Sequence, residues 1–414
     1  MIRCAPAILA LLMLPTALRG AVVPAADPVA LGFSPARLMR LDRFLRTEVS
    51  AGRKAGVVVL LARHGQVAWL KAYGVSDLAS ARPLGTDAMF RLFSMTKPVT
   101  TVALLTLYEQ GRFALTDPLD RYLPAFSHMQ VFDGVDAEGH LKLVPARRKI
   151  TLLDVLRHTA GFTYGYFGDS PIERGYSAAG VDYRQADSLR QLVERLARQP
   201  LLYQPGEHWE YSFAHDVQAY LVEVLTGESF EAYCARVIFG PLGMHDTVFG
   251  IPADRAARFA TLYAPREDGS LKALRGEEDW QQHFTRRPFG GVGLASTAAD
   301  YLRFAQMLLN GGSLHGVRIL GRKTVELMSA DALPAAVSTW QEGIRYGLGL
   351  GVLTAPTIAG VAGSPGELYW PGIATTWMGI DRREDLIALL FTQYTPKDER
   401  FVEQFQALVY QSLD

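Results

Sequence analysis

The stretch Phe93-Ser94-Met95-Thr96-Lys97 places a serine and a lysine three residues apart at the start of an apolar helix predicted over residues 94–110. Residues at this spacing share one helix face, with Cβ atoms roughly 5–6 Å apart. The first turn of a helix also carries free backbone N–H groups and the positive end of the helix dipole. Ser94 is therefore a candidate nucleophile and, through its own N–H, an oxyanion donor, with a desolvated Lys97 as proton acceptor. An N-cap serine followed by a solvated lysine gives the same pattern, so the motif needs its context.

Strand patterns lie on both sides of this helix. Residues 56–62 and 67–73 are apolar and rich in β-branched side chains, and the turn at His64-Gly65 between them predicts a hairpin. Toward the other end, three strands and a closing helix are predicted at residues 346–352, 368–380, 386–392 and 401–413. The sequence therefore predicts an α+β fold, in which strands from both ends form one antiparallel sheet of five or more strands flanked by helices.

The same patterns divide the chain into domains. Residues 30–115 and 286–414 are expected to form a discontinuous α/β sheet domain, and residues 116–285 a mainly helical domain inserted between its two parts. Residues 166–184 are rich in Gly, Ser, Pro and Tyr without a clear period. We interpret them as a long irregular loop that walls a pocket.

Two further segments carry candidate site residues. Tyr211 follows Pro205-Gly206 and precedes a predicted helix, where a phenol beside a lysine can relay a proton. In the segment 369–374, Gly372 would let substrate approach the backbone closely, and the N–H of Ile373 would be a second oxyanion donor. A packing tyrosine and a bulged strand remain the alternative interpretations of these two segments.

The N-terminus and the composition bear on location and partners. A positive Arg3, an apolar run and small residues around Ala21 and Ala25 predict a signal peptide over residues 1–25, and hence an exported protein, periplasmic or secreted. An uncleaved anchor is the alternative; after cleavage no stable membrane insertion is expected. Lys plus Arg and Asp plus Glu both number 42, and this balance argues against a nucleic-acid partner.

Cysteines and histidines indicate neither a disulfide nor a metal. Cleavage of the signal removes Cys4 and leaves Cys234 without an intrachain partner. The nine histidines show no metal-ligand spacing, so we expect no metal and no other cofactor.

Six sequence blocks, at residues 94–97, 153–161, 205–212, 240–247, 290–297 and 370–372, follow one another along the chain. Together they resemble the serine β-lactamase-related superfamily, most closely its family VIII carboxylesterases, which share the class C β-lactamase fold. The blocks run in the family order, and the resemblance extends from about residue 34 to 412. The resemblance implies a β-lactamase/transpeptidase-like fold with an all-helical subdomain. It also implies that Ser94 is the nucleophile, Lys97 its proton-handling partner and Tyr211 the tyrosine of a Tyr-x-Asn motif. His158 matches a structural position of the family.

Two departures from the family pattern point to the substrate. Phe213 stands where the Tyr-x-Asn motif has its amide, and Trp370-Pro371-Gly372 stands where β-lactamases have Lys-Thr-Gly. Both changes remove polar partners of a β-lactam, so a small-molecule carboxylic ester is the expected substrate. The expected pocket residues are Met95, Phe162, Tyr164, Phe213, Trp370 and Gly372. A β-lactamase or D-amino peptidase, an acyltransferase, and a non-catalytic binding relative remain alternatives.

Overall fold

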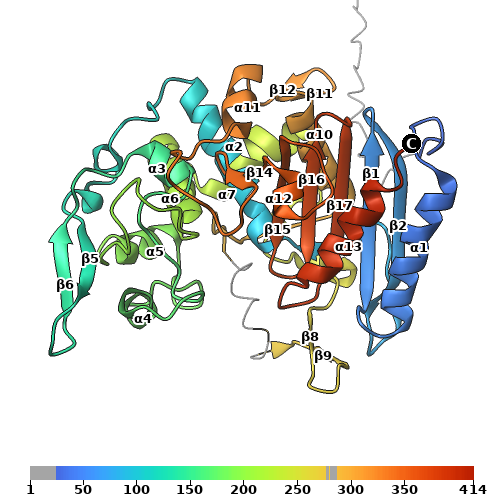
Figure 1. Cartoon of the computed structure of the whole chain (residues 1–414), viewed down its shortest axis with the longest axis horizontal. Helices are drawn as coiled ribbons and strands as arrows, with labels where there is room; N and C mark the ends of the chain where they lie inside the picture. The colour runs from blue at the N-terminus through green and yellow to red at the C-terminus, as the bar shows by residue number, and fades with distance from the viewer. Residues whose placement is uncertain (1–24, 277–278, 280–286) are drawn as a thin grey trace, which may run out of the picture.

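The computed structural model describes residues 25–276, 279 and 287–414 (Figure 1). The signal peptide predicted for residues 1–25 lies, apart from Ala25, outside this part of the chain. Within the described residues, no helix combines the length and the apolar character that a bilayer crossing requires.

An antiparallel sheet of eight strands forms the body that carries both ends of the chain (Figure 1). Its order is β13-β14-β15-β16-β17-β1-β2-β3, so the C-terminal strand β17 pairs with the N-terminal strand β1, with Val57 opposite Thr392. The strands span Gly56–Arg63 (β1), Gln66–Asp77 (β2), Arg82–Pro83 (β3), Ile344–Tyr346 (β13), Gly351–Leu353 (β14), Glu367–Gly372 (β15), Thr376–Asp381 (β16) and Leu386–Thr392 (β17). The predicted α+β fold and antiparallel sheet are confirmed.

Both faces of the sheet are covered, which explains why its central strands are apolar throughout. Helices α1 (Pro35–Ser50) and α13 (Glu399–Tyr410) pack on one face, against alternate residues of β1 and β17. Helices α2 (Thr96–Glu109) and α10 (Ala298–Leu309) pack in the larger core on the other face. Strand residues such as Val58 and Val59 therefore point into different cores.

The C-terminal strands differ from their prediction. Residues 346–352 and 368–380, each expected as one strand, contain a tight turn and contribute two strands each. In the second case Thr375 takes a left-handed φ of 59°, and the chain reverses between β15 and β16. Ile373 consequently lies in this turn rather than on a strand.

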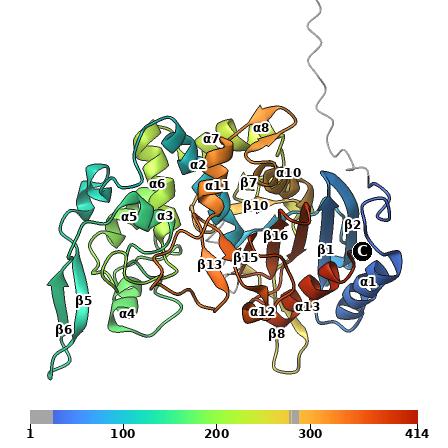
Figure 2. The ribbon, with the colours of Figure 1, turned by 45° about the horizontal axis from the view of Figure 1, so that its top comes forward.

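The helical part lies on the far side of α2 from the sheet (Figures 1 and 2). Its helices are α3 (Leu152–Leu156), α4 (Pro171–Ala178), α5 (Leu189–Leu196) and α6 (Ala214–Thr226), and α7 (Phe230–Cys234) follows α6 and contacts it. Helix α4 lies inside the segment expected to be an irregular loop. The segment therefore contains a regular element, because Ser170 and Glu173 form a capping box at its start.

Smaller elements lie in residues 116–285 and in the segments before and after this range. The hairpin β5–β6 projects from the helical part (Figure 1). The other strands and α-helices of the described residues are β4 (Phe90–Arg91), β5 (Gln130–Val135), β6 (Leu141–Pro145), α8 (Gly240–Leu242), β7 (Val248–Phe249), β8 (Tyr263–Pro265), β9 (Leu271–Ala273), β10 (Leu294–Ser296), β11 (Ser313–Leu314), β12 (Val317–Arg318), α11 (Arg322–Ser329) and α12 (Pro356–Ala359).

Candidate active site

Ser94 lies in a tight turn of residues 93–95 that leads directly into α2. The preceding residue, Phe93, is fully buried and has a left-handed φ of 47°, which is uncommon for a bulky side chain. The turn is also tied to the rest of the core, since the Leu92 N–H donates a hydrogen bond to the Leu294 carbonyl. This packing holds the Ser94 side chain at the edge of a pocket.

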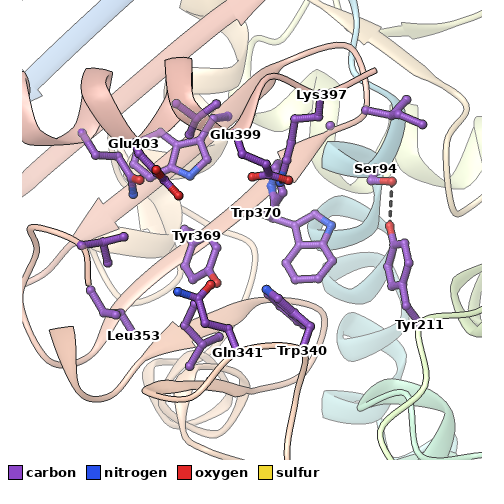
Figure 3. Close-up of a pocket in the computed structure, with 18 of the residues that line it drawn as sticks. Ser94, Tyr211, Trp340, Gln341, Leu353, Tyr369, Trp370, Lys397, Glu399 and Glu403 are labelled. Atoms are coloured by element: carbon purple, nitrogen blue, oxygen red, sulfur yellow. Dashed lines mark hydrogen bonds and ion pairs between the residues drawn. The ribbon is translucent and has the colours of Figure 1, made fainter. Parts of the chain in front are cut away.

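The hydroxyl of Ser94 lies within hydrogen-bond distance of two side chains that can carry a proton. Tyr211, in the loop before α6, donates a 2.7 Å hydrogen bond to Ser94 Oγ (Figure 3). Lys97 Nζ, one helical turn after the serine, lies 3.2 Å from the same oxygen. The three residues predicted from the sequence are thus brought together around one oxygen atom.

Lys97 is completely buried, and this burial changes its protonation. Removal from water lowers the pKa of Lys97 to about 7, while the carboxylate of Asp216 opposes the shift. The amine also donates a 2.8 Å hydrogen bond to the Gly291 carbonyl and lies 4.5 Å from the centre of the Tyr211 ring. A lysine with such a pKa can accept the serine proton near neutral pH.

Asp216, at the start of α6, is a site residue that the sequence interpretation missed. Its buried carboxylate accepts hydrogen bonds from the Tyr183 hydroxyl at 2.7 Å and from the Gly291 N–H at 3.1 Å. Burial raises the pKa of Asp216 to about 6, and the Tyr183 bond and the Lys97 charge oppose this. Gly291 therefore links the carboxylate to the lysine. The sequence did offer a signal for this role, because Asp216 is acidic although the rest of its helix turn packs into the core.

Tyr211 is held as a neutral phenol. Burial raises its pKa above the usual range, and the hydrogen bond to Ser94 only partly offsets this. The ring of His158 packs 5.2 Å from the Tyr211 ring, and its Nδ1 lies 3.0 Å from Ser212 Oγ. Burial lowers the pKa of His158 well below its usual value, so the imidazole is a neutral packing partner.

The pocket beside Ser94 has a volume of about 480 Å³ and is lined by aromatic, aliphatic and acidic side chains. Trp370 and Gly372 of β15 line it, and so does Ile373 in the following turn. Figure 3 shows Trp370 close to the Ser94–Tyr211 pair. A Cβ atom on Gly372 would lie 2.4 Å from the Leu92 carbonyl oxygen. The glycine thus lets β15 approach the Ser94 turn, and its close approach to substrate stays a prediction.

Four expected pocket residues lie behind the pocket. Met95, Phe162, Tyr164 and Phe213 are buried in the main core and do not line the cavity. Phe213 packs 4.4 Å from the Tyr164 ring, and that ring lies 5.7 Å from Lys97 Nζ. Tyr164 is thus a neighbour of the lysine and not of the cavity. The lining instead includes residues that the sequence interpretation did not select, among them Phe167, Trp209, Trp340, Tyr369 and Lys397.

One side-chain cluster among the described residues has the composition of a metal site. Asp136, Glu138 and His140 lie together on the exposed turn of the β5–β6 hairpin. It has no contact with the pocket beside Ser94, whose lining contains no histidine or cysteine.

Comparison with known proteins identifies the family. The beta-lactamase family model matches residues 41–411. Esterase EstB of Burkholderia gladioli is 31% identical over 385 residues, which cover 88% of this chain and 93% of that protein. The solved structure of EstCE1, described as a hydrolase with promiscuous acyltransferase activity, has a TM-score of 0.77 at 26% identity, covering 91% of this chain and 98% of its own. Unliganded simvastatin synthase (LovD) of Aspergillus terreus has a TM-score of 0.78 at 28% identity, covering 93% and 98%.

The match covers most of the chain and includes the Ser94 turn, the Tyr211 loop and strand β15. With its antiparallel sheet and helical part, the chain belongs to the beta-lactamase family and has the beta-lactamase/transpeptidase-like fold.

Proposed function

We propose that this chain is a serine hydrolase that cleaves carboxylic esters through an acyl-enzyme on Ser94. One observation carries the proposal: Ser94 Oγ lies within hydrogen-bond distance of both the Tyr211 hydroxyl and the Lys97 amine. A serine hydroxyl is a weak nucleophile until a neighbouring group takes its proton. Lys97, with a pKa of about 7, supplies such a group at neutral pH.

The proposed reaction has two halves. Ser94 Oγ attacks the ester carbonyl carbon while its proton passes to the neutral amine of Lys97, and the neutral Tyr211 phenol keeps its own proton for the leaving group. The tetrahedral oxyanion is held by the N–H groups of Ser94 and Ile373, and its collapse breaks the bond to the alcohol, which leaves with a proton from Tyr211. Lys97 then returns a proton to Tyr211, which restores the neutral pair. In the second half, water gives up a proton to Lys97 as it attacks the acyl carbonyl, and collapse of the intermediate returns a proton to Ser94 Oγ, which frees the acid.

The pocket supports an ester rather than a β-lactam. Trp370 lines the cavity at the position where the family has a lysine, and Phe213 is buried among tyrosine rings at the position of the amide. A β-lactam carboxylate and acylamide would thus lack these two partners. The likeness to a protein named Esterase EstB agrees with this choice.

Acyl transfer to an alcohol is the second candidate function. The likeness to simvastatin synthase and to EstCE1, a hydrolase described as having promiscuous acyltransferase activity, favours it. The two functions differ only in whether water or an alcohol attacks the acyl-enzyme. Product analysis of a p-nitrophenyl ester in the presence of increasing butanol separates them, because an acyltransferase forms the butyl ester at the expense of the acid.

Purified protein and its Ser94→Ala variant, assayed with p-nitrophenyl butyrate and with nitrocefin, test the ester proposal. We expect ester hydrolysis that the substitution abolishes, and far slower nitrocefin turnover. Equal ester rates in the two proteins would refute the role of Ser94, and comparable nitrocefin turnover would favour a β-lactamase. Export by a cleaved signal over residues 1–25 is also proposed, and N-terminal sequencing of the mature protein tests it.

A further inference from the structure

The pocket that begins at Ser94 continues as a groove along β15 toward the other end of that strand. Its lining runs from Gly372, against the Ser94 turn, to Glu367 at the start of the strand. Since a strand rises about 3.3 Å per residue, the far end lies roughly 15 Å from the serine. The groove can therefore hold a limb of the substrate much longer than a butyryl group.

The two walls of this groove differ in chemistry. One wall is aromatic and aliphatic near the serine, where Trp340 packs 4.9 Å from Trp209 and 5.7 Å from Trp370. The other wall is a face of α13 with Glu399, Glu403 and Gln406, which are spaced at helical intervals. Figure 3 shows the Tyr369 ring between the acidic side chains of α13 on one side and Gln341 on the other.

The far end holds a buried carboxyl group. Glu367 is 2% exposed, and among the described residues no hydrogen-bond partner reaches its Oε2. The hydroxyl of Tyr369 in the same groove is also buried without a hydrogen-bond partner among these residues. Buried polar atoms in proteins are nearly always paired, so two such atoms in one groove point to a ligand group.

The space around this carboxyl group is made by two glycines. A Cβ atom on Gly363 would lie 2.2 Å from Glu367 Oε2, and one on Gly379 would lie 2.7 Å from Glu367 Oε1. Burial and, to a smaller extent, the nearby Asp381 raise the pKa of Glu367 to about 8, and a hydrogen bond with the Tyr410 side chain opposes this shift. An approaching cation would favour the ionised form of Glu367. The loop that contains Gly363 and the strand that contains Gly379 thus leave space between them for the Glu367 carboxyl group.

The charge balance of the lining favours a cation over an anion. Three carboxyl side chains, those of Glu367, Glu399 and Glu403, face one amine, that of Lys397. Lys397 and Glu399 pair with each other at 2.7 Å, and Tyr410 has a hydrogen bond with the Glu367 carboxyl, which leaves Glu403 and the Oε2 atom of Glu367 to meet a ligand. Tryptophan and tyrosine rings nearby also attract cations through their faces.

We propose that this groove selects ester substrates with a long limb that ends in a positively charged amine, bound between Glu367, Glu403 and the ring of Tyr369. The proposal rests on the ester hydrolysis proposed above and specifies the class of its substrate. Either the acyl or the alcohol limb of the ester can enter the groove, and the test distinguishes the two.

Two ester series test this inference at pH 8. The first is p-nitrophenyl alkanoates and the second is alkyl acetates, each with six to fourteen carbons in the long limb and a terminal methyl, hydroxyl or ammonium group. We expect kcat/KM for the ammonium ester to exceed that for the methyl ester at least tenfold, in one series and at the chain lengths that reach Glu367. Glu367→Gln should lower this ratio about tenfold, and Glu138→Gln, on the remote β5–β6 turn, should leave it unchanged.

The outcomes separate this inference from the proposed function. A ratio near one at every chain length in both series, with all esters hydrolysed, overturns the inference alone, whereas no hydrolysis of any ester overturns the function. Equal rates for hydroxyl and ammonium esters overturn the assignment of a cation. Should Glu367→Gln fail to fold, Glu403→Gln at an exposed position is expected to lower the ratio about threefold, and an unchanged ratio in that variant would contradict the proposal.

Discussion

The Tyr211 hydroxyl lies 2.7 Å from Ser94 Oγ, although 117 residues separate the two in the chain. The loop before α6 supplies the phenol and the turn before α2 supplies the serine, and the packing of α2 against α6 brings them together. Lys97 completes the group from the first turn of α2. The proposed chemistry depends on this meeting of three side chains.

Tyr211→Phe should lower kcat for p-nitrophenyl butyrate about 100-fold or more, because it removes the group that protonates the leaving alcohol. KM should change little, since the aromatic ring remains in the pocket. Steady-state kinetics measure both constants. Tyr220→Phe, farther along α6 at a half-buried position, is the matched control and should retain activity. A kcat for Tyr211→Phe equal to that of the control would remove Tyr211 from the mechanism.

The pH dependence should follow Lys97. Its pKa is about 7 in the folded protein, and only the neutral amine accepts a proton, so kcat/KM should rise as pH increases through about 7. The Asp216 carboxylate opposes the lowering of this pKa, so Asp216→Asn should move the rising limb to lower pH. Profiles of kcat/KM between pH 5 and 9 for both proteins measure the shift. A limb that moves to higher pH in the variant would contradict this electrostatic account.

Gly372→Ala should reduce activity at least tenfold, because the added Cβ would lie 2.4 Å from the Leu92 carbonyl and force β15 away from the Ser94 turn. That movement would displace the Ile373 N–H from the position at which we propose it binds the oxyanion. Gly175→Ala in α4 is the control, since no atom lies within 4 Å of its added Cβ. Assays of both variants with p-nitrophenyl butyrate, alongside circular dichroism, test the difference. Full activity in Gly372→Ala would show that the contact is dispensable.

Phe213→Asn, which restores the family amide, should destabilise the protein by about 3 kcal/mol, since it removes a large buried ring and buries an amide among aromatic side chains. Phe213 is fully buried against Tyr164 and Tyr183. Urea denaturation gives the free energy of unfolding. An unchanged midpoint would mean that the amide finds hydrogen-bond partners in this core.

Trp370→Lys should raise nitrocefin turnover relative to ester hydrolysis, because a cation at the pocket wall can meet a β-lactam carboxylate. The ratio of the two rates, measured with one preparation, cancels any loss of folded protein. Trp340→Lys, at a half-exposed position of the same pocket, places the charge elsewhere and serves as the control. An equal ratio in both variants would show that the position of the charge does not matter.

The sequence predicted the elements whose signals are local. Continuous apolar runs identified β1 and β17, because both faces of the central strands are buried. The turn at Thr375 is hard to predict because residues 373–374 before it and residues 377–378 after it are apolar. The capping box at Ser170 was overlooked because the surrounding segment is rich in turn-forming residues.

The site residues, like the elements of the fold, could be predicted only where their signal is local in the sequence. The spacing of Ser94 and Lys97 on one helix made both recognisable, whereas Asp216 acts through Gly291 from a distant segment. The groove could not be predicted, since its lining comes from β15, α13 and the segment around Trp340, and only the folded sheet brings these segments together. Met95 and Phe162 were chosen for their apolar character, which the core explains equally well.

The central claim is that an acyl group becomes attached to Ser94. Protein mixed with p-nitrophenyl butyrate, quenched in acid within milliseconds to seconds and analysed by intact mass and peptide mapping, tests it most directly. The account predicts a mass increase of one butyryl group, located on the peptide that contains Ser94 and absent from Ser94→Ala. Hydrolysis that proceeds without such an adduct, together with an active Ser94→Ala variant or an adduct on another residue, would contradict it.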